Sequence, residues 1–350
     1  MKHKKIFFGI MGVLFFFAIR FLYMRYYCYR GKIESYVKIG FLGDVMLGRL
    51  VNEWLLQNPD PLYPWGDMHA ALQSTDVNIA NMEFAFTTSE QIVPKVFNFK
   101  SLPKHVAVLQ AGNIGVVNLA NNHILDYDVQ GLVQTIKTLD DAGIAHVGAG
   151  INKMAAQAPV ILDIKGIKIG VIGCTDNEPT WIAAENKPGI NYVQVGDIQS
   201  LYSMIQSIRP HVEVLILTMH WGPNMKKRPS KEFKQFAHDL IDAGVDIIQG
   251  HSAHVFQAIE RYKHGLIMYD TGDAVDDYAV DSVLRNDRSF FCVLTLTKRG
   301  IIKANVIPFV IKDMQMHNAS QEDFALIIQE MQQLSAEHQT VISDQGEIIL

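Results

Sequence analysis

Apolar runs bounded by polar residues recur along the first third of the chain. Residues 38–47, 76–84 and 113–121 are rich in aliphatic side chains, and each run ends in or meets acidic, amide or glycine residues. Short apolar runs flanked by turn residues are typical of buried strands. The pattern therefore predicts three buried strands with polar side chains at their ends.

Segments with helical spacing separate these strands. Apolar positions in 128–144 recur every three or four residues, and the segment stops at Gly143, which predicts a helix followed by a C-terminal glycine. The runs 160–174 and 255–273 each hold two apolar halves around a turn and predict hairpins. The other expected elements are helices near 195–208, 230–245 and 320–336 and strands at 212–220, 245–250, "SFFCVLTLT" and "IIKANVIPFV".

The order of these elements indicates the fold class. Strands that alternate with helices, with hairpins between them, favour an α/β body built on a mixed sheet or a pair of sheets. No internal repeat or low-complexity segment interrupts the chain. We expect a single domain over 38–312, followed by a C-terminal helical tail over 313–350.

The N-terminus differs from this globular pattern. The basic start "MKHKK" leads into an apolar run over 6–19, then Arg20, then "FLYM" and a Tyr-rich flank. No small-residue cleavage site follows, and with Arg20 at the interface the span approaches the ~20 residues of a membrane helix. We expect an uncleaved signal-anchor over 1–29 and a linker over 30–37, with the lysines in the cytoplasm and the domain outside. Secretion after signal cleavage is the alternative, and a buried helix is a third interpretation.

Composition narrows the class of protein. Hydrophobic residues make up 49% of the 350 residues and charged residues 19%, which is typical of a folded globular chain. The net charge of -5 and the lack of a recurring basic stripe argue against a nucleic-acid partner. Three scattered cysteines form neither a disulfide framework nor a thiolate metal site.

Five predicted strand ends carry candidate metal ligands. Ligand sites of α/β folds lie beyond the carboxyl ends of strands. Imidazole, carboxylate and amide groups together suit Mn, Fe, Zn or similar divalent ions. A pair of such ions can activate water for hydrolysis. The residues at these ends are Asp44, Asn81, Glu83, Asn121, Asn122, His123, Asp126, His220, His251 and His254.

Each of these residues also has a structural interpretation. Asp44 after a glycine could stabilise a turn, Glu83 could be a solvated charge, and "NNH" could be a polar turn. His220 alone could be a buried, hydrogen-bonded histidine, and two histidines three apart in "GHSAH" recur by chance. The joint occurrence at five strand ends favours a metal site over five unrelated turns.

The order and local context of these motifs resemble the CapA family of poly-γ-glutamate capsule proteins. That family is a branch of the calcineurin-like metallophosphoesterase superfamily. The matching stretches span about 38–275: "FLGDVMLGR", "NMEFAFT", "VNLANNHILDYD", "AGIAHVGAGIN", "MHWG", "LIDAGVDIIQGHSAHVFQAIE" and "MYDTGD". The resemblance implies a four-layer α/β/β/α sandwich of the metallo-dependent phosphatase type with two divalent metal ions.

The resemblance also implies roles for individual residues. Asp44 and His254 would bind the first metal, and Glu83 would bridge the two ions. The second metal would be bound by Asn122, His220 and His251. His123 would act as general acid on the leaving group, with Asp126 as a second catalytic residue. Arg49 and Asn121 are the expected substrate-binding residues, since a guanidinium suits phosphate or carboxylate groups.

Three positions depart from the family's pattern. Met46 stands where the superfamily's first motif has a histidine, as is general in this branch. Asn224 replaces a glutamate that usually follows "HWG". The segment "YDTGDA" over 269–274 places Asp273 where the family has asparagine. The first departure removes one metal ligand, and the other two bear on substrate preference.

Two functions follow from these observations. The first is a membrane-anchored, metal-dependent hydrolase in capsule or exopolymer synthesis or export, in which metal-activated water attacks a phosphoester or an amide. The second is a non-catalytic, membrane-anchored component of a polymer synthesis or export complex. The expected partners are the lipid bilayer, the capsule synthesis and export proteins, and an anionic polymer or phosphoester substrate.

Overall fold

The computed structural model describes residues 35–350. The predicted signal-anchor over 1–29 and most of the predicted linker lie outside the described residues. Within residues 35–350, no helix combines the length and the apolar character needed to span a bilayer. The described part of the chain forms one compact unit over residues 36–350.

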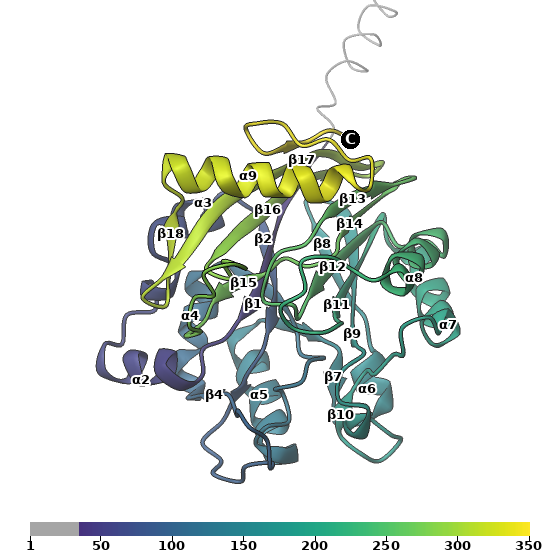
Figure 1. Cartoon of the computed structure of the whole chain (residues 1–350). Helices are drawn as coiled ribbons and strands as arrows, with labels where there is room; N and C mark the ends of the chain where they lie inside the picture. The colour runs from purple at the N-terminus through teal and green to yellow at the C-terminus, as the bar shows by residue number, and fades with distance from the viewer. Residues whose placement is uncertain (1–34) are drawn as a thin grey trace, which may run out of the picture. The chain divides into compact units, whose positions relative to one another are not determined.

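One of the two large sheets of this unit has nine strands. Its order is β18-β17-β16-β1-β2-β5-β6, with β15 beside β1 and β19 beside β17 (Figure 1). The strands are β1 (Val37–Val45), β2 (Val77–Met82), β5 (Ile114–Asn118), β6 (Ala145–Val147), β15 (Asp273–Val275), β16 (Arg288–Thr297), β17 (Gly300–Lys312), β18 (Gln315–Asn318) and β19 (Glu347–Ile348).

The other large sheet has six strands in the order β13-β14-β12-β11-β9-β8. Its strands are β8 (Val160–Ile164), β9 (Ile167–Thr175), β11 (Val214–His220), β12 (Ile247–His251), β13 (Ile259–Tyr262) and β14 (Gly265–Met268). Two small ribbons complete the strands of the described residues: β3 (Ala85–Phe86) with β4 (Lys100–Ser101), and β7 (Ala149–Gly150) with β10 (Gly189–Ile190). The chain thus adopts the mixed α/β fold with several sheets that the sequence predicted.

Most helices lie on the outer sides of the two large sheets, whereas α9 lies across one end of the unit and packs against strands of both sheets. Figure 1 shows α7 and α8 beside the six-stranded sheet, and α2 to α5 on the side of the nine-stranded sheet. The helices are α2 (Arg49–Gln57), α3 (His69–Gln73), α4 (Val106–Ala111), α5 (Asp128–Ala142), α6 (Lys153–Gln157), α7 (Ile198–Ile208), α8 (Lys231–Asp242) and α9 (Gln321–Ala336). Short 3-10 turns lie at Tyr63–Met68, Pro103–His105, Pro179–Trp181 and Arg209–His211.

The hydrophobic core follows from the alternation of side chains along the strands. In β1, the buried Ile39 and Phe41 belong to the cluster shared with the six-stranded sheet, whereas Leu42 and Val45 belong to the cluster beneath α2 to α5. In α8, Ser230 caps the helix by accepting a hydrogen bond from the N–H of Phe233, and one face is buried. The central strands β1, β2, β11 and β12 are buried on both faces, and polar groups gather at their ends.

Most elements expected from the sequence are present. The helix predicted over 128–144 is α5, which ends at Gly143 with a φ of 71°. The hairpin predicted over 160–174 is β8–β9, and the one predicted over 255–273 contains β13–β14. The segment 313–350 contributes α9 and also the strands β18 and β19, which pair with β17.

Parallel pairing brings the polar strand ends together. Strands β1, β2 and β5 are parallel neighbours, with Asp44 in register with Asn81, and Asn81 with Asn118. Strands β9, β11 and β12 are likewise parallel, and His220 is in register with His251. The carboxyl ends of both sets meet between the two sheets, where ligand sites of α/β folds occur.

A glycine permits the closest of these approaches. A Cβ atom at Gly43 would lie 1.7 Å from the carbonyl oxygen of Gly272, so only glycine fits there. The N–H of Asp44 donates a hydrogen bond of 2.9 Å to that oxygen, and β15 pairs alongside β1. Gly43 thereby brings Asp273 beside Asp44.

Candidate metal centre

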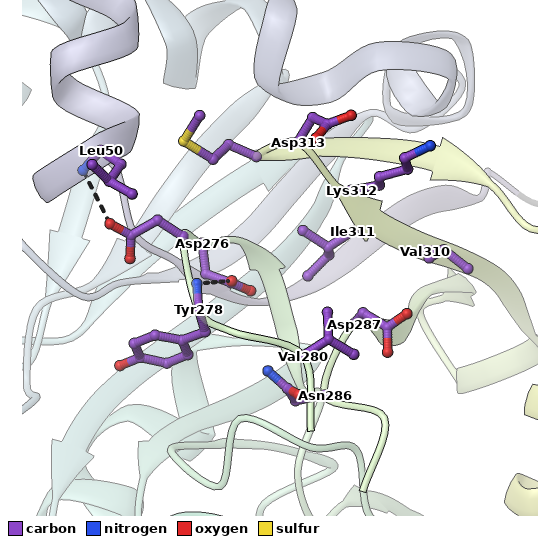
Figure 2. Close-up of a pocket in the computed structure, with 12 residues that line it drawn as sticks. Leu50, Asp276, Tyr278, Val280, Asn286, Asp287, Val310, Ile311, Lys312 and Asp313 are labelled. Atoms are coloured by element: carbon purple, nitrogen blue, oxygen red, sulfur yellow. Dashed lines mark hydrogen bonds between the residues drawn. The ribbon is translucent and has the colours of Figure 1, made fainter. Parts of the chain in front are cut away.

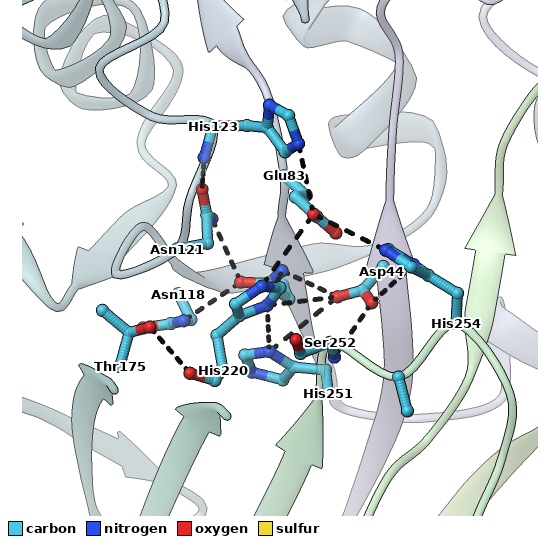
Figure 3. Close-up of polar contacts among 12 residues, drawn as sticks. Asp44, Glu83, Asn118, Asn121, His123, Thr175, His220, His251, Ser252 and His254 are labelled. Atoms are coloured by element: carbon cyan, nitrogen blue, oxygen red, sulfur yellow. Dashed lines mark hydrogen bonds and ion pairs between the residues drawn. The ribbon is translucent and has the colours of Figure 1, made fainter. Parts of the chain in front are cut away.

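Asp44, at the end of β1, lies opposite two histidines of the other sheet. Its Oδ1 atom is 3.8 Å from the Nδ1 atoms of both His220 and His251, and these two nitrogens are 3.1 Å apart. All three side chains are buried (Figure 3). Thr218 and Asn81 fix the arrangement, because the Thr218 hydroxyl lies 2.9 Å from His251 Nε2 and the Asn81 amide donates to Asp44. The three side chains form a group that could hold a metal ion.

The other oxygen of Asp44 belongs to a second such group. Asp44 Oδ2 lies 3.4 Å from His254 Nδ1, and the same nitrogen lies 2.8 Å from Asp273 Oδ1. These three buried side chains form the second candidate metal group. The loop that presents His254 is strained, because Ser252 and His254 have φ values of 116° and 56°. Both candidate groups therefore share the carboxylate of Asp44.

Glu83 faces both groups with unsatisfied oxygens. Neither carboxylate oxygen accepts a hydrogen bond within the described residues, although both are buried. Its Oε1 atom lies 3.9 Å from His220 Nε2, 3.9 Å from His254 Nε2 and 3.8 Å from His123 Nε2 (Figure 3). The side-chain oxygen of Asn122 is also buried without a partner in that part of the chain. Because buried polar atoms are normally paired, these orphaned oxygens fit divalent cations.

The electrostatics of the cluster agree with this fit. Burial and the neighbouring Asp44 charge hold the pKa of Glu83 well above its usual value, and burial likewise raises the pKa of Asp273. Burial lowers the pKa of His251 to about 4 and holds that of His220 well below its usual value. The cluster thus crowds carboxyl groups in a low-dielectric site beside neutral imidazoles, the form in which histidine binds metals.

The pKa values of Asp44 and His254 shift in the direction that favours the charged form, unlike those of their neighbours. Burial opposes the ionisation of Asp44, but the hydrogen bond with His254 and the surrounding histidines outweigh it and lower the pKa of Asp44. Burial opposes the charging of His254, but Asp273 and Glu83 outweigh it and hold the pKa of His254 well above its usual value. In this arrangement His254 carries the positive charge that partly balances the carboxylates.

His123 projects over the cluster from the loop after β5. Its Nδ1 atom lies 2.6 Å from Asp126 Oδ2, and its ring packs edge-on against Phe99 at 4.4 Å. Burial lowers the pKa of His123, while the hydrogen bond with Asp126 opposes this shift. The second oxygen of Asp126 accepts a hydrogen bond of 3.0 Å from Lys95, so Asp126 links the histidine to a lysine.

A pocket of about 620 Å³ opens above this histidine. His123, His254, Asn122, Lys95, Phe97 and Tyr278 are among its lining residues. Tyr278 also lines a neighbouring cavity of about 400 Å³, where Leu50, Asp276 and Ile311 approach from separate elements (Figure 2). The larger pocket gives an external molecule access to His123 and His254, two residues of the buried cluster.

The two predicted substrate-binding residues differ in position. Asn121 is fully buried, donates to Asn81 and the carbonyl of Met82, and accepts from the N–H of His123. Its amide holds the loop in place, and its role as a substrate contact stays a prediction. Arg49 lies against Phe97 and pairs with Asp277 at 3.2 Å, so it stands behind one wall of the pocket.

Two residues of the site were not assigned a role from the sequence. Asp273 was noted only as a departure from a family motif, and Lys95 was not singled out. Lys95 donates hydrogen bonds to the carbonyl of Asn122 and to Asp126, and it lies 3.8 Å from Glu178. The acidic residue in "TGDA" could have identified Asp273 as a candidate ligand. No sequence pattern pointed to Lys95, because it lies in an irregular loop.

Comparisons with known proteins show the family of this chain. The family described as "Bacterial capsule synthesis protein PGA_cap" matches residues 38–278. This chain belongs to that family. A probable polyglutamine synthesis accessory protein of Mycobacterium tuberculosis is 32% identical over 298 residues, covering 80% of this chain and 78% of the relative. The PGA biosynthesis protein CapA of Bacillus subtilis is 30% identical, covering 70% of this chain and 66% of that protein.

The PGA_cap match spans both groups of candidate ligands, from Asp44 to Asp273. Among solved structures, a hypothetical protein from Thermus thermophilus superposes with a TM-score of 0.48 at 13% identity, covering 78% of this chain and 99% of that chain. A 5′-nucleotidase precursor from the same organism gives a TM-score of 0.48 at 11% identity, covering 85% of this chain and 57% of that chain.

Proposed function

We propose that this PGA_cap protein is a metal-dependent hydrolase that acts in the synthesis or export of an anionic capsule polymer. The observation that carries the proposal is the position of Asp44, whose two oxygens face separate groups of buried ligands. The proposal includes the four-layer α/β/β/α sandwich of metallo-dependent phosphatases, which the helices outside two large sheets support.

The residues that would hold the ions are the members of the two buried candidate groups. One ion would be held by Asp44, His254 and Asp273, and the other by Asp44, His220 and His251. Glu83 and Asn122 would complete the site with their unpaired oxygens. Two divalent ions held there would supply Lewis acidity and lower the pKa of water near the scissile group.

His123 is our candidate for the proton donor to the leaving group. Its Nδ1 atom is engaged by Asp126, so the other ring nitrogen is the one that can exchange a proton with a substrate. Asp126 is a positioning residue, since it fixes the ring and has no free oxygen to act directly. Lys95 and Arg49 add positive charge around the pocket, which favours a phosphoester or carboxylate substrate.

The names of the relatives support the biological setting. Proteins described as acting in PGA biosynthesis and polyglutamine synthesis are similar to this chain over most of its length. We propose that the segment over 1–29 anchors the protein in the cell membrane with the domain outside, next to proteins of polymer synthesis or export. The word "accessory" in one relative's name favours a second candidate, a non-catalytic component of such a complex.

Hydrolysis of a chromogenic phosphodiester tests the proposal. The full chain is purified, stripped with a chelator and assayed with added Mn²⁺, Fe²⁺ or Zn²⁺. We expect metal-dependent turnover that is lost in His251→Ala and His123→Ala, whereas the exposed His264→Ala serves as a matched control and keeps activity. Amide cleavage is assayed in parallel with a γ-linked glutamyl peptide. Lack of turnover on both substrates in a metal-loaded protein would favour the non-catalytic candidate.

A further inference from the structure

The loop between β11 and α8, together with the first turn of α8, is the most basic stretch of the described chain near the site. Residues 226–234 read "KKRPSKEFK", five basic residues and one acidic residue in a chain whose net charge is -5. The loop starts directly after His220 and ends at the N-terminal cap of α8, Ser230. It therefore joins the candidate metal centre to an outer surface of opposite charge to the whole protein.

This loop lines two cavities in succession. Asn224 and Met225 line the pocket above the metal centre. Lys226 and Arg228 line a second cavity of about 220 Å³, whose walls include the rings of Trp221 and Phe233. None of the residues that line the two cavities is an aspartate or a glutamate, and the ones that can carry a positive charge are lysine, arginine and histidine. The walls of both cavities therefore carry no acidic side chain that would repel an anionic ligand.

Contacts within the protein hold the loop in place. The N–H of Met225 donates to the carbonyl of Ala253, and the Gln257 amide donates to the carbonyl of Lys226. Lys227 pairs with Glu330 at 2.9 Å, and Arg228 pairs with Glu337 at 2.8 Å, both on or next to α9. A surface that is fixed before binding loses less conformational entropy when a ligand arrives.

Two lysines remain available, Lys226 in the loop and Lys231 at the first position of α8. Lys226 and Lys231 are exposed, and neither forms an ion pair with any of residues 35–350. The largely buried Trp221 ring forms part of the cavity wall, and its N–H is donated to the carbonyl oxygen of Tyr269. Cations beside aromatic faces suit a ligand that carries carboxylates on short aliphatic arms.

We propose that the cavity lined by Trp221, Phe233 and Lys226, with Lys231 following at the start of α8, is a second binding site for a carboxylate-bearing polymer chain that extends from the metal-centre pocket. The assignment of a polymer rests on the proposed function; the location rests on charge and shape. Lys226 and Lys231 pair with successive carboxylates, and the aromatic rings contact the aliphatic arms between them. The site binds a part of the polymer that lies away from the bond cleaved at the metal centre.

Binding of poly-glutamate to the full chain in detergent tests this site. We expect the double variant Lys226→Glu/Lys231→Glu to bind poly-glutamate at least roughly tenfold more weakly than the wild type, since the reversal removes two attractive charges and adds two repulsive ones. The control Lys153→Glu/Lys303→Glu changes the net charge equally at exposed sites elsewhere and should bind as the wild type does. Wild-type affinity should fall as salt is raised.

Separate outcomes distinguish this site from the metal centre. Phosphodiester turnover and the melting temperature of Lys226→Glu/Lys231→Glu should equal those of the wild type, and Asp44→Asn should still bind poly-glutamate. Equal poly-glutamate binding by Lys226→Glu/Lys231→Glu and by the control variant would contradict the proposed site. Polyphosphate of matched charge binding as tightly as poly-glutamate would overturn its assignment to a carboxylate polymer. Neither result depends on whether the metal centre turns over.

Discussion

His220 and His251 occupy paired positions at the ends of two parallel strands, and their Nδ1 atoms lie 3.1 Å apart. Both nitrogens are 3.8 Å from the same oxygen of Asp44. Adjacent parallel strands in register must present their end residues side by side, so the pairing follows from the sheet. Two imidazoles and one carboxylate converging in a buried site form a ligand set suited to a transition-metal ion.

Divalent metal should stabilise the folded chain. An ion at a hundred times its Kd adds about 2.7 kcal/mol to the free energy of unfolding, which corresponds to several degrees in Tm. Thermal unfolding of the full chain with a chelator and with added Mn²⁺ or Zn²⁺ measures this shift. Asp44→Asn should abolish the response and His264→Ala should keep it. Identical melting in chelator and metal would argue against the centre.

His123→Ala should lower kcat by roughly 10²–10⁴-fold, because a positioned proton donor contributes that range. Asp126→Asn should lower it less, roughly 10–100-fold, since the ring remains but loses the partner that orients it. Metal content measured on both proteins should equal that of the wild type. A loss of bound metal in His123→Ala would instead assign this histidine to metal binding.

Lys95 should act through its positive charge and its contacts. Its amino group lies 3.0 Å from Asp126 and contacts the carbonyl of Asn122. We expect Lys95→Ala to lower kcat/KM about tenfold, the scale of one lost charged hydrogen bond. Lys95→Arg should recover most of this loss and shift KM more than kcat. Equal activity of Lys95→Ala and the wild type would show that Lys95 does not contribute to catalysis.

The metal-free chain should lose stability as the pH falls from about 6.5 towards 4. Burial lowers the pKa of His251 to about 4, whereas the unfolded histidine titrates near 6.5. The unfolded chain therefore binds more protons in this window, and each unit of pH costs up to about 1.4 kcal/mol. Urea unfolding of wild type and His251→Gln in chelator should show a shallower pH dependence in the variant. Parallel curves would contradict the buried, neutral state of His251.

The sequence was sufficient for the parts of the site that follow regular strands. Asp44, Glu83, His220 and His251 end or follow strands whose apolar runs are unmistakable, and parallel pairing then gathers them. The sequence did not reveal which group each ligand side chain would face, because this depends on the register between strands. Asp44, expected at one ion only, faces both groups in the structure.

Residues in irregular segments escaped prediction for a physical reason. Asp273 reaches Asp44 because Gly43 allows the backbone of Gly272 to approach β1, a contact between residues more than two hundred positions apart. Lys95 lies in a segment without helical or strand periodicity, so no pattern indicated where its side chain would point. The burial of Asn121 likewise depends on the hydrogen bonds of one loop rather than on any spacing.

Metal stoichiometry tests the central claim most directly. The full chain is purified, dialysed against Mn²⁺ or Zn²⁺ at micromolar free concentration and analysed by elemental mass spectrometry. Two divalent ions per chain are expected in the wild type and in His264→Ala, and fewer in Asp44→Asn and His251→Ala, with all four proteins folded by circular dichroism. Wild-type protein that binds no ion, with His251→Ala as stable as the wild type, would contradict a metal centre.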